Sequence, residues 1–563
     1  MNRFHVLYDN FKDAILQHNE LAAESLISDP ALPVNGFQCQ GDDKALIFWT
    51  IDNDQKNIMQ MLLKREDFSV NILDGYYGRT PLYAVCEQGR CDFVEVLLTH
   101  RNIKVNIGNF NENSSPLMIA LELHHNECVK ALLKSEYIDV NYAGIEGFNH
   151  EPDQFNYPPL IIATQHENIK GVELMVQDPR TDVNIMDVTG YTALCIAAKN
   201  LNELIVDILL KHPAIDVNKT NADNGFMPLI HAILETIRQG SKGYKTVATL
   251  LSHKNIDPNQ QPDLHGVTCL YVAVRDNELT CVQLLLKHPK ILPALSNTDD
   301  DEFPLFTAAE QNHPAIMKEL LNHDLIQVNQ KNSENGMTAL ISAAALENIT
   351  CLELLLAHPE IDVNLGLDYD QTLLYVTVLH GAYESVKILL QDMRTKINQP
   401  TLHGETALMV AARQGFNEIV ELLLTDTFAG RLFPGAYTTW NLANSTIKNP
   451  NSAIPPGLLS NYIFSFLRPR TDVNKTINSD LSSLPAELVE NSVPGASALW
   501  MAAANGHADC VDSLLEHEYI DAKLPDLQGR TPLNIATTNG YADCKTLLED
   551  FISGRRIPKA KRL

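Results

Sequence analysis

The sequence has no run of eighteen apolar residues, few cysteines and comparatively few basic side chains. Without such a run no helix is long and apolar enough to cross a bilayer. The first fifteen residues include acidic and polar side chains where a secretory signal needs an uninterrupted apolar stretch. These absences predict a soluble protein that is not inserted in a membrane, and we expect it in the cytoplasm.

Basic residues are outnumbered, with 43 Lys and Arg against 70 Asp and Glu, for a net charge of -27 over 563 residues. Nucleic-acid affinity comes largely from Lys and Arg that displace counterions from phosphates, so DNA and RNA are excluded as expected partners. The one basic run lies at 553–563, and we interpret it as a solvated tail.

The ten cysteines are too scattered for a disulfide framework or a zinc site. Four of them stand four residues before the first leucine of a Leu-Leu pair, which makes them one recurring helical position with a small apolar side chain. These four are Cys128, Cys281, Cys351 and Cys510.

What the sequence does contain is a repeat. A short phrase, most often Asp-Val-Asn, recurs along the chain, and most neighbouring copies lie 34 to 36 residues apart. Two copies are degenerate, at Leu292-Pro293-Ala294 and Asp521-Ala522-Lys523. A fixed period of this length predicts stacked units of one supersecondary type rather than several unrelated domains.

Each period has the same internal order, which Thr406 to Gly415 (TALMVAARQG) illustrates. Thr406 can accept a hydrogen bond from an amide of the first helical turn, and paired alanines allow a neighbouring helix to approach closely. Gly415 supplies a left-handed turn. A second helix with a Leu-Leu pair follows, and neither helix could bury its apolar face without a stacked neighbour.

A polar hairpin, a T-P-L or T-A-L helix start, paired alanines, a glycine turn and a Leu-rich second helix together resemble the ankyrin repeat. The resemblance covers nearly the whole chain, with about 13 clear copies and one degenerate copy. It implies an all-α repeat fold, the ankyrin α-solenoid, with short β-hairpin fingers. The family's T-P-L-H histidine is absent here, since Tyr83, Cys195, Tyr271 and Ile341 stand in its place.

The repeat phase divides the chain into five parts. We expect an N-terminal helical cap at 1–33, about 11 repeats at 34–428, a degenerate repeat or insertion at 429–471, two C-terminal repeats at 472–552 and the basic tail at 553–563. Three units are stretched, at 142–158, near 234–246 and at 475–494. Surface loops tolerate such additions at small cost.

No motif of a hydrolase, nucleotide-binding or metal site is present. Seven of the nineteen histidines fall two residues after a Leu-Leu pair, where an imidazole can bond the last carbonyls of a helix. They are His100, His212, His253, His288, His323, His358 and His517. We therefore expect a monomeric protein that is not an enzyme and has no cofactor and no metal.

The resemblance implies a protein-binding scaffold whose fingers and first helices line a concave surface. Aromatic residues gather in the second to fourth fingers, where the repeat pattern does not require them, and aromatics anchor protein interfaces. The candidate partner-binding residues are Tyr76, Tyr77, Phe110, Phe148, Phe155 and Tyr157. The array resembles those of protists and of translocated effectors of intracellular bacteria, and this resemblance implies an effector that acts in the cytoplasm of a host cell.

The stretch from Ile454 to Leu467 (IPPGLLSNYIFSFL) has two interpretations. In phase with the Asp-Val-Asn phrase that follows it, it is the second helix of an eroded repeat. It also resembles the core of an F-box, which would make the protein a substrate receptor for a ubiquitin ligase, although Gly457 occupies the acidic position of that motif. The F-box-like residues are Pro455, Leu458, Leu459, Ile463, Phe464 and Leu467.

Overall fold

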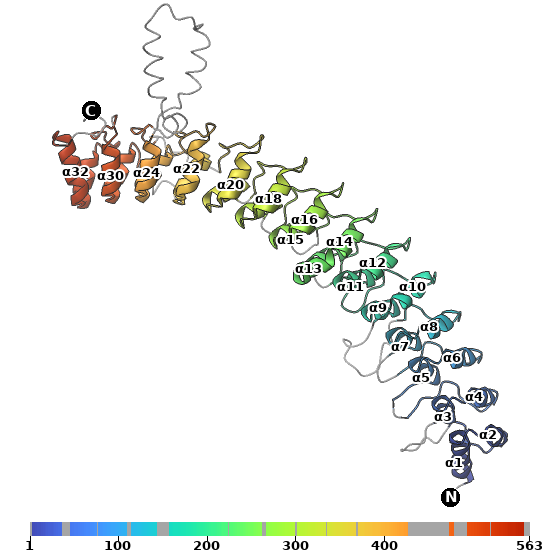
Figure 1. The fold of residues 1–563 in the computed structure, drawn as a ribbon. Coiled ribbons are helices and arrows are strands. Elements are labelled where there is room, and N and C mark those ends of the chain that lie inside the picture. Colours follow the sequence, from blue (N-terminus) through green and yellow to red (C-terminus); the bar gives the residue numbers. More distant parts are fainter. Residues whose placement is uncertain are drawn as a thin grey trace, which may run out of the picture. The chain divides into compact units, whose positions relative to one another are not determined.

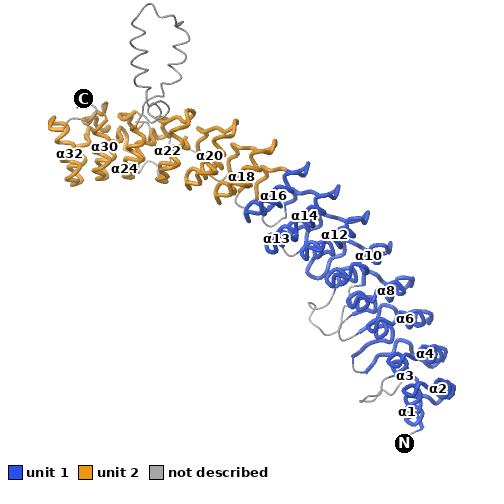
Figure 2. The backbone as a smooth tube through the Cα atoms, in the orientation of Figure 1, with its two compact units in different colours: residues 1–291 blue, residues 292–563 orange. Residues whose placement is uncertain are grey.

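The structure is a computed structural model. It describes residues 3–35, 45–75, 77–109, 114–142, 157–222, 225–261, 266–298, 301–333, 335–367, 370–425, 472–477, 493–517 and 519–556. The chain divides into two compact units, residues 1–291 and residues 292–563 (Figure 2). Each unit is an array of antiparallel helix pairs.

Unit 1 begins with a cap of two helices, α1 (Arg3–Leu16) and α2 (Glu20–Ile27), and continues with seven helix pairs (Figure 1). The first helices of these pairs are α3 (Leu46–Asp52), α5 (Pro81–Glu87), α7 (Pro116–Glu122), α9 (Pro159–Gln165), α11 (Ala193–Lys199), α13 (Pro228–Gln239) and α15 (Cys269–Arg275). The second helices are α4 (Lys56–Leu63), α6 (Cys91–Leu98), α8 (Asn126–Leu133), α10 (Ile169–Gln177), α12 (Glu203–Leu210), α14 (Tyr244–Leu251) and α16 (Leu279–Leu286).

Unit 2 contains six helix pairs among its described residues. The first helices are α17 (Pro304–Glu310), α19 (Ala339–Ala345), α21 (Leu373–Leu379), α23 (Ala407–Gln414), α29 (Ala498–Asn505) and α31 (Pro532–Asn539). The second helices are α18 (Pro314–Leu321), α20 (Ile349–Leu356), α22 (Tyr383–Gln391), α24 (Asn417–Leu424), α30 (Ala508–Leu515) and α32 (Ala542–Ile552). The all-α repeat fold and the thirteen clear repeats predicted from the sequence are thereby confirmed.

First helices stack on first helices and second helices on second helices, as in α5 on α7 and α6 on α8. The first helices inside the array are almost entirely buried because a neighbour covers each side, whereas the last one, α31, buries only three residues. In α11, all residues from Ala193 to Ala198 are buried. The second helices bury only one face, and α12 leaves Leu204 59% exposed. This division explains why alanines mark the first helix and a Leu-rich stripe marks the second.

The predicted helix starts are present. The Thr80 hydroxyl accepts a hydrogen bond from the Tyr83 amide at 3.2 Å, and Thr192, Thr338 and Thr406 make the equivalent bond in their repeats. Gly415 ends α23 with a left-handed φ of 79°, as the sequence predicted. An added Cβ there would also lie 2.6 Å from the His507 ring, so only glycine fits this turn.

The fingers contain isolated antiparallel bridges and no longer strands within the described part of the chain. Two of these bridges join Arg79 to Asn109 and Met186 to Thr192. The first of these bridges joins two neighbouring fingers and the second closes a single finger, so the described fingers are turns with at most isolated bridges.

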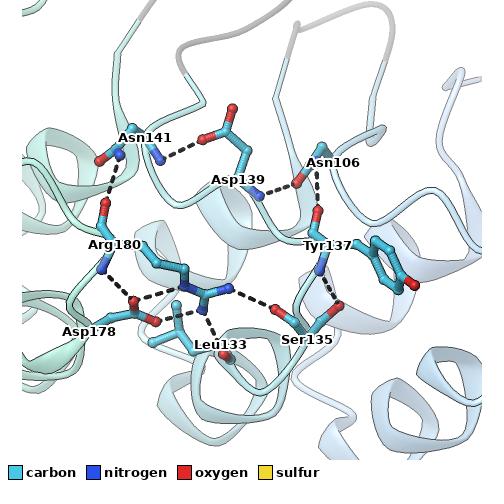
Figure 3. A network of polar contacts seen from close by, with 8 residues as sticks. All are labelled: Asn106, Leu133, Ser135, Tyr137, Asp139, Asn141, Asp178 and Arg180. Carbon is cyan, nitrogen blue, oxygen red and sulfur yellow. Dashed lines mark hydrogen bonds and ion pairs between the residues drawn. The ribbon is translucent and has the colours of Figure 1, made fainter.

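In most described joints, the asparagine of the recurring phrase joins one repeat to the next. The Asn184 side-chain amide donates to the Ala214 carbonyl at 2.7 Å, and its oxygen accepts from the Asp216 amide at 2.8 Å. We call this two-bond contact a rung (Figure 3 shows both bonds of Asn106 and the bond from the Asn141 amide to the Arg180 carbonyl). Both bonds form at Asn35, Asn71, Asn106, Asn141, Asn184, Asn218, Asn329, Asn364 and Asn474.

An arginine reinforces some of these contacts. The Arg180 guanidinium donates to the carbonyls of Ser135 and Leu133, both at 2.8 Å, and pairs with Asp178 at 2.6 Å (Figure 3). It thus ties the loop after α10 to the end of α8. Its hydrogen bonds to the Asp178 carboxylate are the main reason that the pKa of Asp178 is lowered.

The degenerate copy at 292–294 places Ala294 where other repeats have the rung asparagine. Replacing Ala294 by asparagine is expected to raise the free energy of unfolding of this part of unit 2 by about 1 kcal/mol, because a new side chain can bond the Leu325 carbonyl and the Gln327 amide. Urea denaturation and amide exchange of α17 and α19 would measure the change. Ala294→Asp, which cannot donate to the carbonyl, should gain less, and an equal gain would contradict the rung.

The helices on either side of 426–471 contact each other directly: α23 packs on α29, and α24 on α30. The Asn398 oxygen accepts from the Asp472 amide at 2.9 Å, which is one of the two bonds of a rung. The degenerate repeat predicted at 429–471 lies outside the described residues. In the described part of the chain, no additional helix pair lies between the pair α23 and α24 and the pair α29 and α30.

Candidate protein-interaction surface

Several fingers are held by a polar side chain at their start. The Asp187 carboxylate accepts from the amides of Thr189 and Tyr191, both at 2.9 Å. Asn221 accepts from the Phe226 amide at 2.9 Å in the next repeat. The backbone of the residue just before the first-helix cap is therefore fixed, because its amide is one of the bonded groups.

We call this last finger residue the finger base. In unit 1 the described finger bases are Arg79, Ser114, Tyr157, Tyr191, Phe226 and Val267, and in unit 2 they are Glu302, Met337, Gln371, Glu405, Ala496 and Arg530. All except Ala496 are partly accessible to solvent. A fixed backbone with a partly exposed side chain in every repeat forms a regular surface next to the first helices.

Charged finger bases are paired within the array. Arg79 bonds the carboxylates of Asp74 at 2.7 Å and Glu87 at 2.5 Å. Glu405 accepts from the Arg413 guanidinium at 2.9 Å and from the Tyr375 hydroxyl at 2.7 Å. These side chains hold neighbouring elements together, so they are poorly available to a partner.

Three consecutive repeats of unit 1 instead have aromatic finger bases, Tyr157, Tyr191 and Phe226, all half-buried. His231 on α13 packs between two of them: its ring centroid lies 5.3 Å from that of Tyr191 and 5.9 Å from that of Phe226. The Lys199 ammonium lies 5.2 Å from the centre of the Tyr191 ring. We call Tyr157, Tyr191, Phe226 and His231 the aromatic patch.

His231 is 6% exposed, and its Nε2 has no hydrogen-bond partner among the residues that the structure describes. Burial, which is the largest cause, and the nearby Lys199 together lower the pKa of His231 to about 4, although Glu235 opposes them. The imidazole is therefore neutral at physiological pH, and it contributes to the patch as a ring rather than as a charge.

The structure describes two of the six aromatic residues predicted to bind a partner. Tyr157 belongs to the aromatic patch. Tyr77 is 51% exposed at the tip of its own finger, with the Arg79 guanidinium carbon 4.3 Å from its ring centre. Tyr76, Phe110, Phe148 and Phe155 lie outside the described residues, as do Pro455, Leu458, Leu459, Ile463, Phe464 and Leu467, so the F-box-like alternative stays a prediction.

Sequence reasoning missed Tyr191 and Phe226. The signal was available, because both stand directly before the capping position of the first helix, as Tyr157 does. That position is accessible in almost every described repeat, whereas the tip of a finger differs in length from one repeat to the next.

The histidines predicted to bond the last carbonyls of the second helices do something else. In all seven, Nδ1 accepts from the backbone amide two residues later, as His212 does from Ala214 at 3.3 Å. The prediction was wrong because the chain turns at once after the helix and brings that amide to the ring. An accepting Nδ1 requires the neutral imidazole.

The four cysteines of the repeated helical position are buried, as predicted. Burial raises the pKa of Cys281 to about 12 and that of Cys351 and Cys510 to about 11, so these thiols are poor nucleophiles. In the described part of the chain, no three His, Cys, Asp or Glu side chains come together as metal ligands. Nor does any described helix have the length and apolar character to span a membrane.

A family model described as ankyrin repeats (three copies) matches residues 13–109, 47–144, 104–187, 142–221, 160–262, 289–366, 361–430 and 473–556, which is more than half of the chain. Among curated proteins, the chain is 27% identical to ankyrin repeat protein nuc-2 of Neurospora crassa over 210 residues, which is 37% of this chain and 18% of that protein. It is 32% identical to the putative ankyrin repeat protein FPV031 of fowlpox virus over 181 residues, which is 31% of this chain and 48% of that protein. The matches thus span less than half the length of these relatives.

Solved structures with a similar fold include the ankyrin repeat domain of Bcl-3, a member of the IkappaB family. That match is 19% identical, covers 39% of this chain and 92% of that chain, and has a TM-score of 0.35. An ankyrin repeat domain from Acinetobacter baumannii AYE is 22% identical, with 45% and 98% of the two chains covered and a TM-score of 0.31.

Proposed function

The chain belongs to the ankyrin-repeat family, and on that premise we propose that it is a non-catalytic scaffold that binds a partner protein through the finger and first-helix surface of unit 1. The observation that carries the proposal is the aromatic patch. Family membership supports protein binding in general, and the patch suggests where on this chain the partner binds.

Half-buried aromatic rings are suited to this role. They bury a large area on contact and lose little conformational entropy, because few bonds rotate. Here the entropy loss is smaller still, since the amides of Tyr191 and Phe226 are already bonded to Asp187 and Asn221. Unit 2 has no aromatic residue at its described finger bases, so the proposal assigns the partner to unit 1.

We expect the double substitution Tyr191→Ala and Phe226→Ala to weaken partner binding at least about tenfold, because hot-spot aromatics each contribute more than about 1 kcal/mol. The measurement is affinity capture from a cell lysate with quantitative mass spectrometry, comparing wild type and variant at equal loading. Circular dichroism would verify that the variant remains folded.

Tyr137→Ala is the matched control. Tyr137 is 79% exposed in the same unit, but it lies in the loop after α8, away from the finger bases. Captured proteins that survive the double substitution and are lost with Tyr137→Ala would place the binding surface elsewhere and end the proposal.

The location of the chain in the cytoplasm, including a host cytoplasm after translocation, is proposed from the likeness to other ankyrin arrays alone. None of the described residues adds support for it.

A further inference from the structure

The first helices next to the aromatic patch end in basic residues, although the chain as a whole has a net charge of -27. The last turns of α11, α13 and α15 contain Lys199, Arg238 and Arg275. Lys199 is exposed, and the side chains of Arg238 and Arg275 are 72% and 41% exposed. Lys242, just beyond α13, is exposed too.

Two other first helices of unit 1, α5 and α7, carry a negative charge at this position. α5 ends at Glu87 and α7 at Glu122. In unit 2, α17 ends at Glu310, and burial together with the neighbouring Glu302 raises the pKa of that carboxyl. Among the described first helices of unit 1, basic character is thus confined to α11, α13 and α15. In unit 2, α23 has Arg413 in its last turn, but that guanidinium is bonded to the Glu405 carboxylate at 2.9 Å.

The intrachain partners of these cations are few and exchangeable. Arg238 pairs with Glu235 at 3.1 Å, and Arg275 pairs with Asp276 at 2.8 Å. Lys199 lies over the Tyr191 ring and has no carboxylate partner among the described residues. Of the four cations, Arg238 and Arg275 thus pair with the carboxylates of Glu235 and Asp276. In both pairs the cation keeps 41% or more of its side chain exposed, so it remains accessible to a second acceptor.

Lys199 also shows that the basic ends of the first helices lie next to the aromatic patch. Its ammonium comes from the end of α11 and reaches the ring at the finger base of the same repeat. A single extended segment lying across these repeats can therefore place a carboxylate at a helix end and an apolar side chain on the aromatic patch.

We infer that the partner presents an acidic segment that carries an apolar or aromatic side chain, and that Lys199, Arg238 and Arg275 bind its carboxylates. This inference rests on the proposed function of the aromatic patch. In a chain of net charge -27, an acidic segment is repelled by most of the surface and attracted here. Such local attraction combined with repulsion elsewhere fixes the position and register of a partner.

The test is a display library of random twelve-residue peptides, selected in parallel on the full wild-type chain and on a Lys199→Glu, Arg275→Glu variant. Peptides enriched on wild type relative to the variant should be acidic and contain at least one large apolar residue. The parallel selection removes basic peptides that bind the acidic remainder of the protein. One enriched peptide, synthesised with a fluorescent label, should lose at least about tenfold in affinity on the variant, and its affinity should fall as salt rises.

Lys130→Glu with Lys170→Glu is the control, because it makes the same charge change on the second helices of unit 1 and should leave the affinity within about twofold. If the differentially enriched peptides are neutral or basic, the acidic partner is wrong. Peptides lost with Tyr191→Ala and Phe226→Ala but not with charge reversal would preserve the proposed function and overturn this inference. Peptides unaffected by both sets of substitutions would overturn both.

Discussion

Replacing Asn218 by alanine is expected to lower the free energy of unfolding of unit 1 by about 2 kcal/mol, because two hydrogen bonds between neighbouring repeats are lost at about 1 kcal/mol each. The Asn218 amide donates to the Asn255 carbonyl at 2.8 Å, and its oxygen accepts from the Asp257 amide at 2.9 Å. Each repeat is stabilised by its neighbours, so α14 and α16 should exchange their amides faster than the rest of the unit. Hydrogen-exchange mass spectrometry measures this locally.

Asn255→Ala provides the comparison for this substitution. Asn255 contributes only its backbone carbonyl to the rung, and its side chain is exposed, so alanine should change the free energy by no more than about 0.5 kcal/mol. Equal effects at the two positions would show that the rung does not hold the repeats together.

Lowering the pH from 7.5 to 5.0 is expected to destabilise unit 1 by about 2 kcal/mol through His231 alone. Its pKa of about 4 in the folded chain lies below the unfolded value of about 6.5, so the unfolded state takes up the proton first. The contribution of neutral His231 to the free energy of unfolding is therefore fully present above pH 6.5 and is lost as the pH falls towards 4. Burial also lowers the pKa of His100, His253 and His288. Their protonation therefore lowers the free energy of unfolding further as the pH falls.

Urea denaturation at several pH values measures this dependence. The variant His231→Phe keeps a ring against Tyr191 and Phe226 but has no proton to bind, so it should lose most of the 2 kcal/mol dependence. If the wild type and the variant respond to pH alike, protonation of His231 is not the cause.

Most of the fold could be predicted from the sequence because its determinants are local. Thr80 or Thr406 caps a helix within three residues, and Gly415 turns the chain where it stands. The role of the recurring asparagine could not be predicted in the same way. Its partners, such as Ala214 and Asp216 for Asn184, lie some thirty residues later and become neighbours only when the repeats stack.

The candidate site was harder to predict for a related reason. The place of Tyr191 directly before the cap Thr192 marks it as a finger base, but the sequence does not show which finger bases gather into a patch. Its significance comes from Phe226 and His231, which belong to the next repeat and meet it only in the stack. Aromatic composition directed attention to the longer fingers instead, and of those residues only Tyr157 coincides with the patch.

The rung also determines where this chain can accept inserted residues. In every described joint with a full rung, the carbonyl that receives the asparagine amide lies four residues before the next phrase position, as Ala214 does before Asn218 and Asn255 before Asn259. One added residue within those four would move the amide away from its acceptor and break the register of the array. The stretched repeats have their extra residues after the asparagine, as at 142–158, or between the two helices, as in the longer α13. Sites for grafting loops or epitopes into this scaffold can be chosen by the same rule.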